Sequence, residues 1–311
     1  MKFSVGYQAR GDDLLVDTIK ENAAKIAEIY FSWGDFASGR SAQTQSDDLT
    51  PWELIEIQKN ALSVLSKRGI KFNLLFNANC YGKDSQSHAF FEKIGQTADY
   101  IMTNYGLQSV TTASPLIAKF FKNNFEGTDV RASVNMEIGT VQGMDYLADY
   151  FDSFYVKREL NRDKDSIRVL HDYATENGKK LFMLANSGCL NNCSAHNFHD
   201  NLVAHEAEIV KMDNCYDFCG ICHEYLKKEG NIQKIIDNTN FVRPEDIDSY
   251  DGLFTAAKLA TRIHKNPTEV LKSYINRKYS GDILRLLEPA HSIYPYVVEN
   301  GEPLTIKKIG E

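Results

Sequence analysis

The chain has 311 residues, of which 43% are hydrophobic and 25% charged, with a formal net charge of −7 at pH 7. This composition is typical of a globular protein, and the acidic balance argues against a chain that coats nucleic acid or an anionic membrane. No apolar run approaches the ~18 residues of a membrane-spanning helix, and MKFSVGYQARGDD lacks the features of a signal peptide. The sequence therefore predicts a cytoplasmic protein with no membrane insertion, whose thiols stay reduced.

Short apolar or β-branched runs alternate with amphipathic stretches along the chain, as in repeated β–α units. Eight such units favour a closed (β/α)8, TIM-barrel-like α/β fold over an open doubly wound sheet, which shows a similar alternation. The expected strands are Lys2–Tyr7, Ile26–Phe31, Ile70–Asn77, Asp99–Asn104, Val130–Asn135, Ser153–Val156, Lys180–Ala185 and Thr255–Leu259.

Residues Thr50–Arg68 carry the clearest helical pattern between the strands. Thr50 is a natural N-cap, Pro51 suits the first helical position, and Gly69 suits the end. The apolar side chains expected on the buried face are Leu54, Ile57, Ala61, Val64 and Leu65.

The sequence also predicts where the barrel ends. Residues 1–265 form the barrel domain, and residues 266–311 form a small extension packed on it. In that extension Asn266–Leu287 reads as a pair of helices, and Tyr294–Ile309 as a hairpin around Asn300-Gly301.

Five of the six cysteines lie within residues 186–222, an insertion after the seventh expected strand. Loops at the C-terminal ends of barrel strands build the active site of such enzymes, so the insertion begins on that face. Thiolates at these spacings can converge on one metal or cluster, and five exceed the four ligands required. The candidate ligands, four of the five, are Cys189, Cys193, Cys215, Cys219 and Cys222.

Zinc and an iron–sulfur cluster are both compatible with this segment. Zinc also accepts imidazole, which His196, His199, His205 and His223 offer, whereas irregular all-cysteine spacing favours a cluster. The C-x3-C-x2-C spacing also occurs in radical S-adenosylmethionine enzymes, but its position two-thirds along the chain argues against that class.

Charged residues after three strands are further candidates for the barrel mouth. VKRELNRD (156–163) follows the sixth strand and NANCYG (77–82) the third, while Lys258 and Arg262 follow the last. Arg158 and Glu159 either pair with each other or face an anionic substrate. Arg40 and Arg243 present the same alternatives.

Several catalytic motifs are missing from the sequence. It contains no G-x-S-x-G, H-E-x-x-H, GxxxxGK[ST] or GxGxxG, which disfavours simple serine hydrolases, zincins, P-loop nucleotide enzymes and Rossmann folds.

Motifs spread over most of the chain resemble the peptidase U-32 (collagenase-like) family. They are FASGRS at Arg40, Asn77, SVNME at Asn135, KREL at 157–160, GCLNNC, the H-x-N-x3-H run at His199 and His205, FVRPEDIDSYD at Arg243, KLATR and YSGDIL. The distal motifs are closer to the branch related to oxygen-independent hydroxylases of ubiquinone synthesis and to enzymes of RNA modification.

The resemblance implies a barrel-like fold and a 4Fe-4S cluster held by four cysteines. The expected function is therefore iron–sulfur-dependent hydroxylation, or a related modification, of an aromatic or carboxylate-bearing metabolite or an RNA base. Alternatives are a U-32 peptidase, although no motif supplies its nucleophile, a cluster-bearing partner of a homologous barrel protein, and a structural zinc protein. The expected catalytic residues are Arg158, Glu159, His199, His205 and Arg243, and the expected substrate-binding residues are Arg40, Asn77, Asn135 and Lys258.

Overall fold

The computed structural model describes residues 1–39, 49–205, 221–226, 228, 230, 231 and 237–289, together with the backbone of 296–298 and 306–308. Eight parallel strands close into a barrel in which each strand pairs with its sequence neighbour and β1 also pairs with β8. The strands are β1 (Phe3–Gly6), β2 (Ile26–Phe31), β3 (Phe72–Phe76), β4 (Leu107–Thr112), β5 (Asp129–Ala132), β6 (Ser153–Tyr155), β7 (Lys180–Leu184) and β8 (Ala256–Leu259). The predicted (β/α)8 fold is confirmed.

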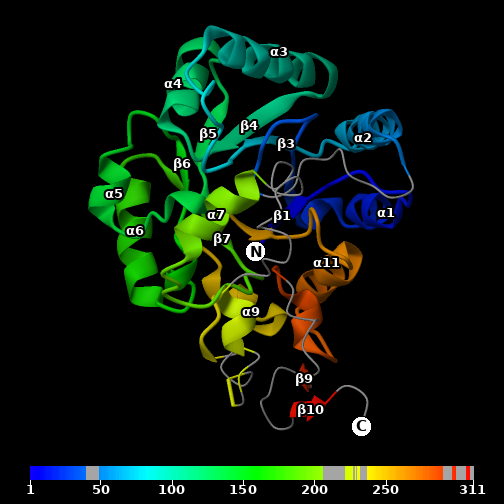
Figure 1. The fold of residues 1–311 in the computed structure, drawn as a ribbon, viewed down its shortest axis with the longest axis vertical. Coiled ribbons are helices and arrows are strands. Elements are labelled where there is room, and N and C mark those ends of the chain that lie inside the picture. The colour runs from blue at the N-terminus through cyan, green and yellow to red at the C-terminus, as the bar shows by residue number, and fades with distance from the viewer. Residues whose placement is uncertain are drawn as a thin grey trace.

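Helices surround the strands on the outside of the barrel (Figure 1). The α-helices are α1 (Leu14–Glu21), α2 (Pro51–Ser66), α3 (His88–Tyr105), α4 (Pro115–Asn124), α5 (Val141–Asp145), α6 (Lys164–Glu176), α7 (His196–Ala204), α9 (Ile221–Leu226) and α11 (Pro267–Asn276). Short 3-10 helices are η1 (Ala23–Lys25), η2 (Val134–Met136), η3 (Arg158–Leu160), η4 (Pro244–Tyr250) and η5 (Ile283–Leu286). Among the described residues no helix combines the length and apolar character needed to cross a bilayer.

One expected strand is wrong: Asp99–Asn104 lies inside α3, and the fourth strand is Leu107–Thr112. Ser87 caps the start of α3 by accepting a hydrogen bond from the Phe90 N–H, and Gly106 ends the helix at φ 82°. The buried side chains of α3, Ile94, Ala98 and Ile101, recur every three to four residues. The short apolar run at 99–104 was therefore one part of a longer helical face.

The N-terminal chemistry expected for α2 is confirmed. The Thr50 hydroxyl accepts from the Glu53 N–H, and the Glu53 carboxylate accepts from the Thr50 N–H at 2.8 Å, which completes a capping box. Leu54, Ala61 and Leu65 are buried as expected, but Val64 is 40% exposed. Leu62 is buried on the face that packs on the barrel.

A buried ion pair lies inside the barrel, toward the N-terminal ends of the strands. Arg131 on β5 donates to both carboxylate oxygens of Glu28 on β2 and, at 2.8 Å, to Asp129. The guanidinium carbon of Arg131 also stacks 3.6 Å from the ring centroid of Phe182. The charges of Arg131, Glu28 and Asp129 are paired with one another, although they line a hollow of about 690 Å³ at the N-terminal ends of the strands. The cavity at the opposite, C-terminal ends is where barrel enzymes place their active sites.

The C-terminal part follows directly from β8. Helix α11 packs against α1 and η4, in the position of the eighth barrel helix. Strands β9 (Tyr296–Val298) and β10 (Ile306–Lys308) pair antiparallel, as the expected hairpin requires. The proposed turn at Asn300-Gly301 lies outside the described residues.

Candidate functional site

Loops from around the barrel converge on a cavity of about 70 Å³ at the C-terminal ends of the strands. Its lining comes from the segments that follow β2, β3, β5, β6, β7 and β8. The lining residues used below are Tyr30, Gly39, Asn77, Asn135, Arg158, Cys189, Asp200, Lys258 and Arg262. The sequence predicted six of them as site or mouth residues: Asn77, Asn135, Arg158, Cys189, Lys258 and Arg262.

Arg158 is the central side chain of this mouth. It begins η3 directly after β6 and is only 5% exposed. Its Nη1 donates to the Cys189 Sγ at 3.2 Å and contacts His196 Nε2, and its Nη2 donates to Asn135 Oδ1 at 3.1 Å. Asp200 lies 3.6 Å from the same Nη2. Arg158 therefore points into the mouth and is paired there with protein groups, while its binding of an anionic substrate stays a prediction.

Asn135 and Asn77 extend the network toward the loop after β2. Asn135 Nδ2 donates to the Asn77 carbonyl at 3.4 Å, and the Gly39 N–H donates to Asn77 Oδ1 at 3.2 Å. A Cβ on Gly39 would lie 3.0 Å from Asn77 Nδ2 and 3.1 Å from Asn135 Nδ2. The glycine of FASGRS thus allows the backbone to approach both amides closely.

Helix α7 presents His196 and Asp200 to the mouth, one turn apart. His196 Nδ1 lies 2.6 Å from the Glu137 carboxylate, whereas Nε2 faces Arg158 and lies 3.4 Å from Asp200. A guanidinium only donates, so these contacts assign the neutral tautomer with the proton on Nδ1. Burial, and then the Arg158 charge, lower the pKa of His196, which agrees with a neutral ring at pH 7.

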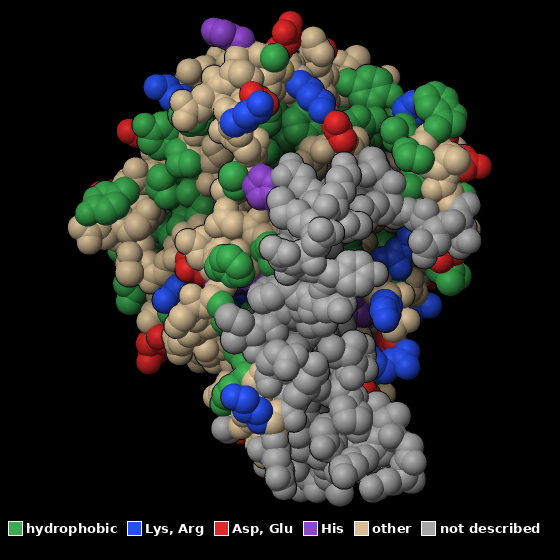
Figure 2. Space-filling view, in the orientation of Figure 1, with side chains coloured by type: hydrophobic (Ala, Val, Ile, Leu, Met, Phe, Trp, Pro, Cys, Tyr) green, Lys and Arg blue, Asp and Glu red, His purple; other side chains and the backbone are tan. Residues whose placement is uncertain are grey.

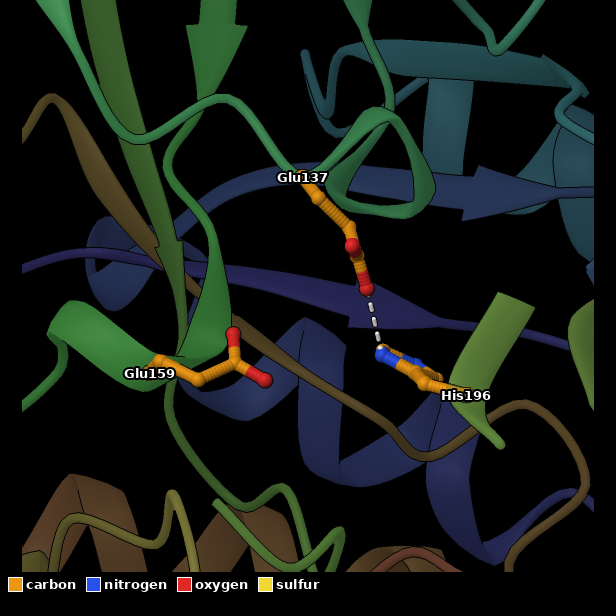
Figure 3. A group of neighbouring side chains, drawn as sticks. All are labelled: Glu137, Glu159 and His196. Carbon is orange, nitrogen blue, oxygen red and sulfur yellow. Dashed lines mark ion pairs between the residues drawn. The ribbon is translucent and has the colours of Figure 1, made fainter. Parts of the chain in front are cut away.

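Glu137, Glu159 and His196 form the one group of three potential metal ligands that the described residues contain. Their ligand atoms lie within 4.8 Å of one another, and Figure 3 shows the side chains directed toward a common space from the β5 loop, η3 and α7. Two carboxylates and an imidazole suit Zn²⁺ or another divalent ion. A metal on His196 Nδ1 would have to displace the hydrogen bond to Glu137.

Lys258 and Arg262 add positive charge to the other wall of the cavity. Lys258 sits on β8 with its Nζ 4.2 Å from the Tyr30 ring centroid, and Arg262 donates to the Ser32 hydroxyl at 2.7 Å. Burial, and then the Arg262 charge, lower the pKa of Lys258 from 10.5 to about 7. An anion in the cavity would relieve this repulsion between like charges.

The structure describes three of the five candidate cysteine ligands. Cys189 lines the mouth cavity, Cys193 lines a surface hollow together with Tyr225 and Asn238, and Cys222 lies on α9. Cys215 and Cys219 are outside the described residues. A four-iron cluster needs four such ligands, so iron–sulfur and zinc binding by this segment stay predictions.

The other predicted residues lie apart from the cavity lining or outside the description. Arg243 caps the start of η4 and pairs with Asp246 at 3.2 Å, while His199 lies on α7 and His205 at its C-cap. Arg40 is outside the described residues. Their catalytic and binding roles stay predictions.

Charged side chains of both signs are interspersed over the described part of the face shown in Figure 2. The described part of that face carries no broad basic stripe of the kind that follows a nucleic-acid backbone. The concentrated positive charge of the site is instead inside the mouth, on Arg158, Lys258 and Arg262.

The fold and mouth define a single-barrel protein of the (β/α)8 class. No family model matches the chain. It is 27% identical over 244 residues to the uncharacterized protease MJ1657 of Methanocaldococcus jannaschii, with 75% of this chain and 69% of that protein covered. The solved U32 peptidase Mk0906 shares the fold, with a TM-score of 0.59 at 15% identity over 83% of this chain and 91% of that chain. These findings confirm the predicted resemblance to the peptidase U-32 family, but not its iron–sulfur branch.

Proposed function

We propose that the chain is a U-32-type peptidase that holds a substrate carboxylate in the barrel mouth and cleaves an amide bond with Cys189. The observation that carries this proposal is the position of Cys189, whose Sγ lies 3.2 Å from Arg158 Nη1 inside the cationic cavity. The name of the archaeal relative, a protease, supports the same reaction class.

The cavity constrains how a peptide would bind. At roughly 10–15 Å³ per water position, a cavity of about 70 Å³ accepts only a few non-hydrogen atoms. The end of a peptide fits this space and its middle does not. The C-terminal carboxylate is the group that Arg158, Lys258 and Arg262 would bind, because charge-assisted hydrogen bonds to a carboxylate are the strongest that these side chains make.

The cleavage step uses the thiol as the nucleophile. Cysteine sulfur forms covalent intermediates in enzymes, and the sulfur of Cys189 faces the Arg158 guanidinium in the cavity. The sulfur bonds to the carbonyl carbon, the C–N bond breaks, and the leaving amine takes up the thiol proton. Water then hydrolyses the thioester, which releases the acid and restores the thiol.

The test is amide hydrolysis with Cys189→Ser as the central variant. We expect turnover of short peptides with a free C-terminus to fall by on the order of 10³-fold or more, while peptide binding persists. Cys193→Ser is the matched control, because Cys193 lines a different hollow. Full activity of Cys189→Ser would contradict the proposed nucleophile.

A second candidate is the iron–sulfur enzyme, favoured by the density of cysteines after β7. Four of Cys189, Cys193, Cys215, Cys219 and Cys222 would hold the cluster, which would supply electrons or Lewis acidity for modification of an aromatic metabolite or RNA base. Anaerobically purified protein would then contain iron and sulfide, and its visible absorption would bleach with dithionite. Loss of this absorption in Cys189→Ser would assign Cys189 to the cluster, whereas protein without iron would refute this candidate.

A further inference from the structure

Lys258 is a buried lysine whose amine forms no salt bridge or hydrogen bond within the described part of the chain, although the charge of Glu28 acts on it from farther away. It is 8% exposed, and its Nζ lies 4.2 Å from the Tyr30 ring centroid and 5.3 Å from that of Tyr155. Buried lysines are normally paired with an acid. Lys258 instead rests on two aromatic faces at the edge of the mouth cavity.

The charges around Lys258 favour its neutral form. Burial and the neighbouring guanidinium groups of Arg262, Arg158 and Arg131 lower its pKa to about 7, and Glu28 opposes them only in part. At neutral pH about half of the Lys258 side chains are then neutral amines, against roughly one in three thousand for an ordinary lysine. A neutral amine in a largely desolvated setting is the form that attacks carbonyl groups.

The same cavity can position a carbonyl next to this amine. Arg158 and Arg262 line it together with Lys258, so a carboxylate bound by the guanidinium groups brings an adjacent carbonyl carbon to the lysine wall. A small 2-oxo acid carries these two groups side by side. Its few non-hydrogen atoms suit a cavity of about 70 Å³.

We propose that Lys258 forms an imine with a small 2-oxo acid held in the barrel mouth. The Lys258 nitrogen adds to the carbonyl carbon to give a carbinolamine, which takes up one proton from solvent and loses one molecule of water to give the protonated imine. Addition of water and release of that proton reverse both steps, and no oxidant or reductant takes part. This activity goes beyond the proposed function: it uses the cavity but neither Cys189 nor peptide cleavage.

Borohydride trapping with pyruvate tests the inference. Reduction of the imine leaves one pyruvyl-derived group on the lysine as a stable secondary amine, which peptide mapping by mass spectrometry locates. We expect the label on Lys258 and little on Lys272, an exposed lysine of α11 that serves as the internal control. Labelling at Lys258 should rise as the pH passes through about 7, because the neutral amine is the reacting form.

Two further samples separate specific capture from general reactivity. Lactate, which has the carboxylate but no carbonyl, should leave no label, and Lys258→Arg should lose it while keeping the circular dichroism of the wild type. Absence of a Lys258 adduct, or equal labelling of Lys258 and Lys272, would overturn the inference. Protein that hydrolyses peptides without being labelled would refute this inference alone, whereas labelled protein without hydrolysis would refute only the peptidase.

Discussion

Replacement of Arg158 by alanine is expected to lower the free energy of unfolding by about 3–5 kcal/mol, the usual cost of removing one partner from a buried ionic network. Arg158 is only 5% exposed, and its guanidinium contacts Asn135 on η2 and both Cys189 and His196 in the segment that follows β7. Its removal would leave Asp200 without its buried cation. The same change should abolish carboxylate binding in the mouth.

Arg158→Lys separates the charge from the geometry. A lysine keeps the positive charge but cannot donate to partners in several directions from one rigid fork, so we expect only part of the stability and affinity to return. Denaturant unfolding and calorimetric titration measure the two effects. Arg168→Ala is the control, because Arg168 pairs with Asp165 on the surface and should matter by less than about 1 kcal/mol. Equal unfolding midpoints for Arg158→Ala and Arg168→Ala would contradict a stabilising role of the buried Arg158 network.

Replacement of Lys258 by methionine is expected to stabilise the protein, by about 4 kcal/mol at pH 7. The folded-state pKa of Lys258 is about 7, against an ordinary 10.5, so between these values the unfolded chain binds the proton more tightly than the folded one. At 1.36 kcal/mol per pKa unit, burial of this amine costs the folded state about 4 kcal/mol at neutral pH. Methionine has a similar length and needs no proton.

The sign of the pH dependence is the sharper check on Lys258. Wild-type stability should rise with pH from 7 toward 10.5, as the unfolded lysine loses its proton, and the advantage of Lys258→Met should shrink over the same window. Denaturant unfolding at several pH values measures this, with Lys272→Met as the exposed control within about 0.5 kcal/mol. A constant difference between Lys258→Met and wild type across this range would contradict a lowered pKa.

Local signals explain which parts of the fold the sequence could predict. The N-cap at Thr50 and the run Ile26–Phe31 are encoded within a few residues, and both appear as expected. The strand predicted at Asp99–Asn104 was wrong because Ile101, its buried residue, belongs to the buried face of α3. That helical pattern is visible only over the full length of the helix. The predicted burial of Val64 was wrong because several positions on α2 fit the helical period. Packing against the barrel decides which of these side chains are buried.

The site likewise contains residues that the sequence predicted and residues that it missed. Asn77, Asn135, Arg158, Cys189 and Lys258 follow or end barrel strands, and barrel topology brings such positions together. The role of Asp200 was missed, although its i, i+4 spacing from His196 was a signal, because only the packing of α7 over the mouth selects that face. Arg243 belongs to a sequence motif, but its guanidinium pairs with Asp246 on η4. The two residues are three positions apart, so the sequence alone was compatible with this local ion pair.

Calorimetric titration with a matched pair of short peptides, one with a free C-terminal carboxylate and one with a C-terminal amide, tests the cationic mouth most directly. A charge-assisted hydrogen bond contributes about 1.5–3 kcal/mol, so the free acid should bind on the order of 10- to 100-fold more tightly. This preference should disappear in Arg158→Ala. Equal affinity of wild type for the acid and the amide would contradict a carboxylate-binding site at the barrel mouth.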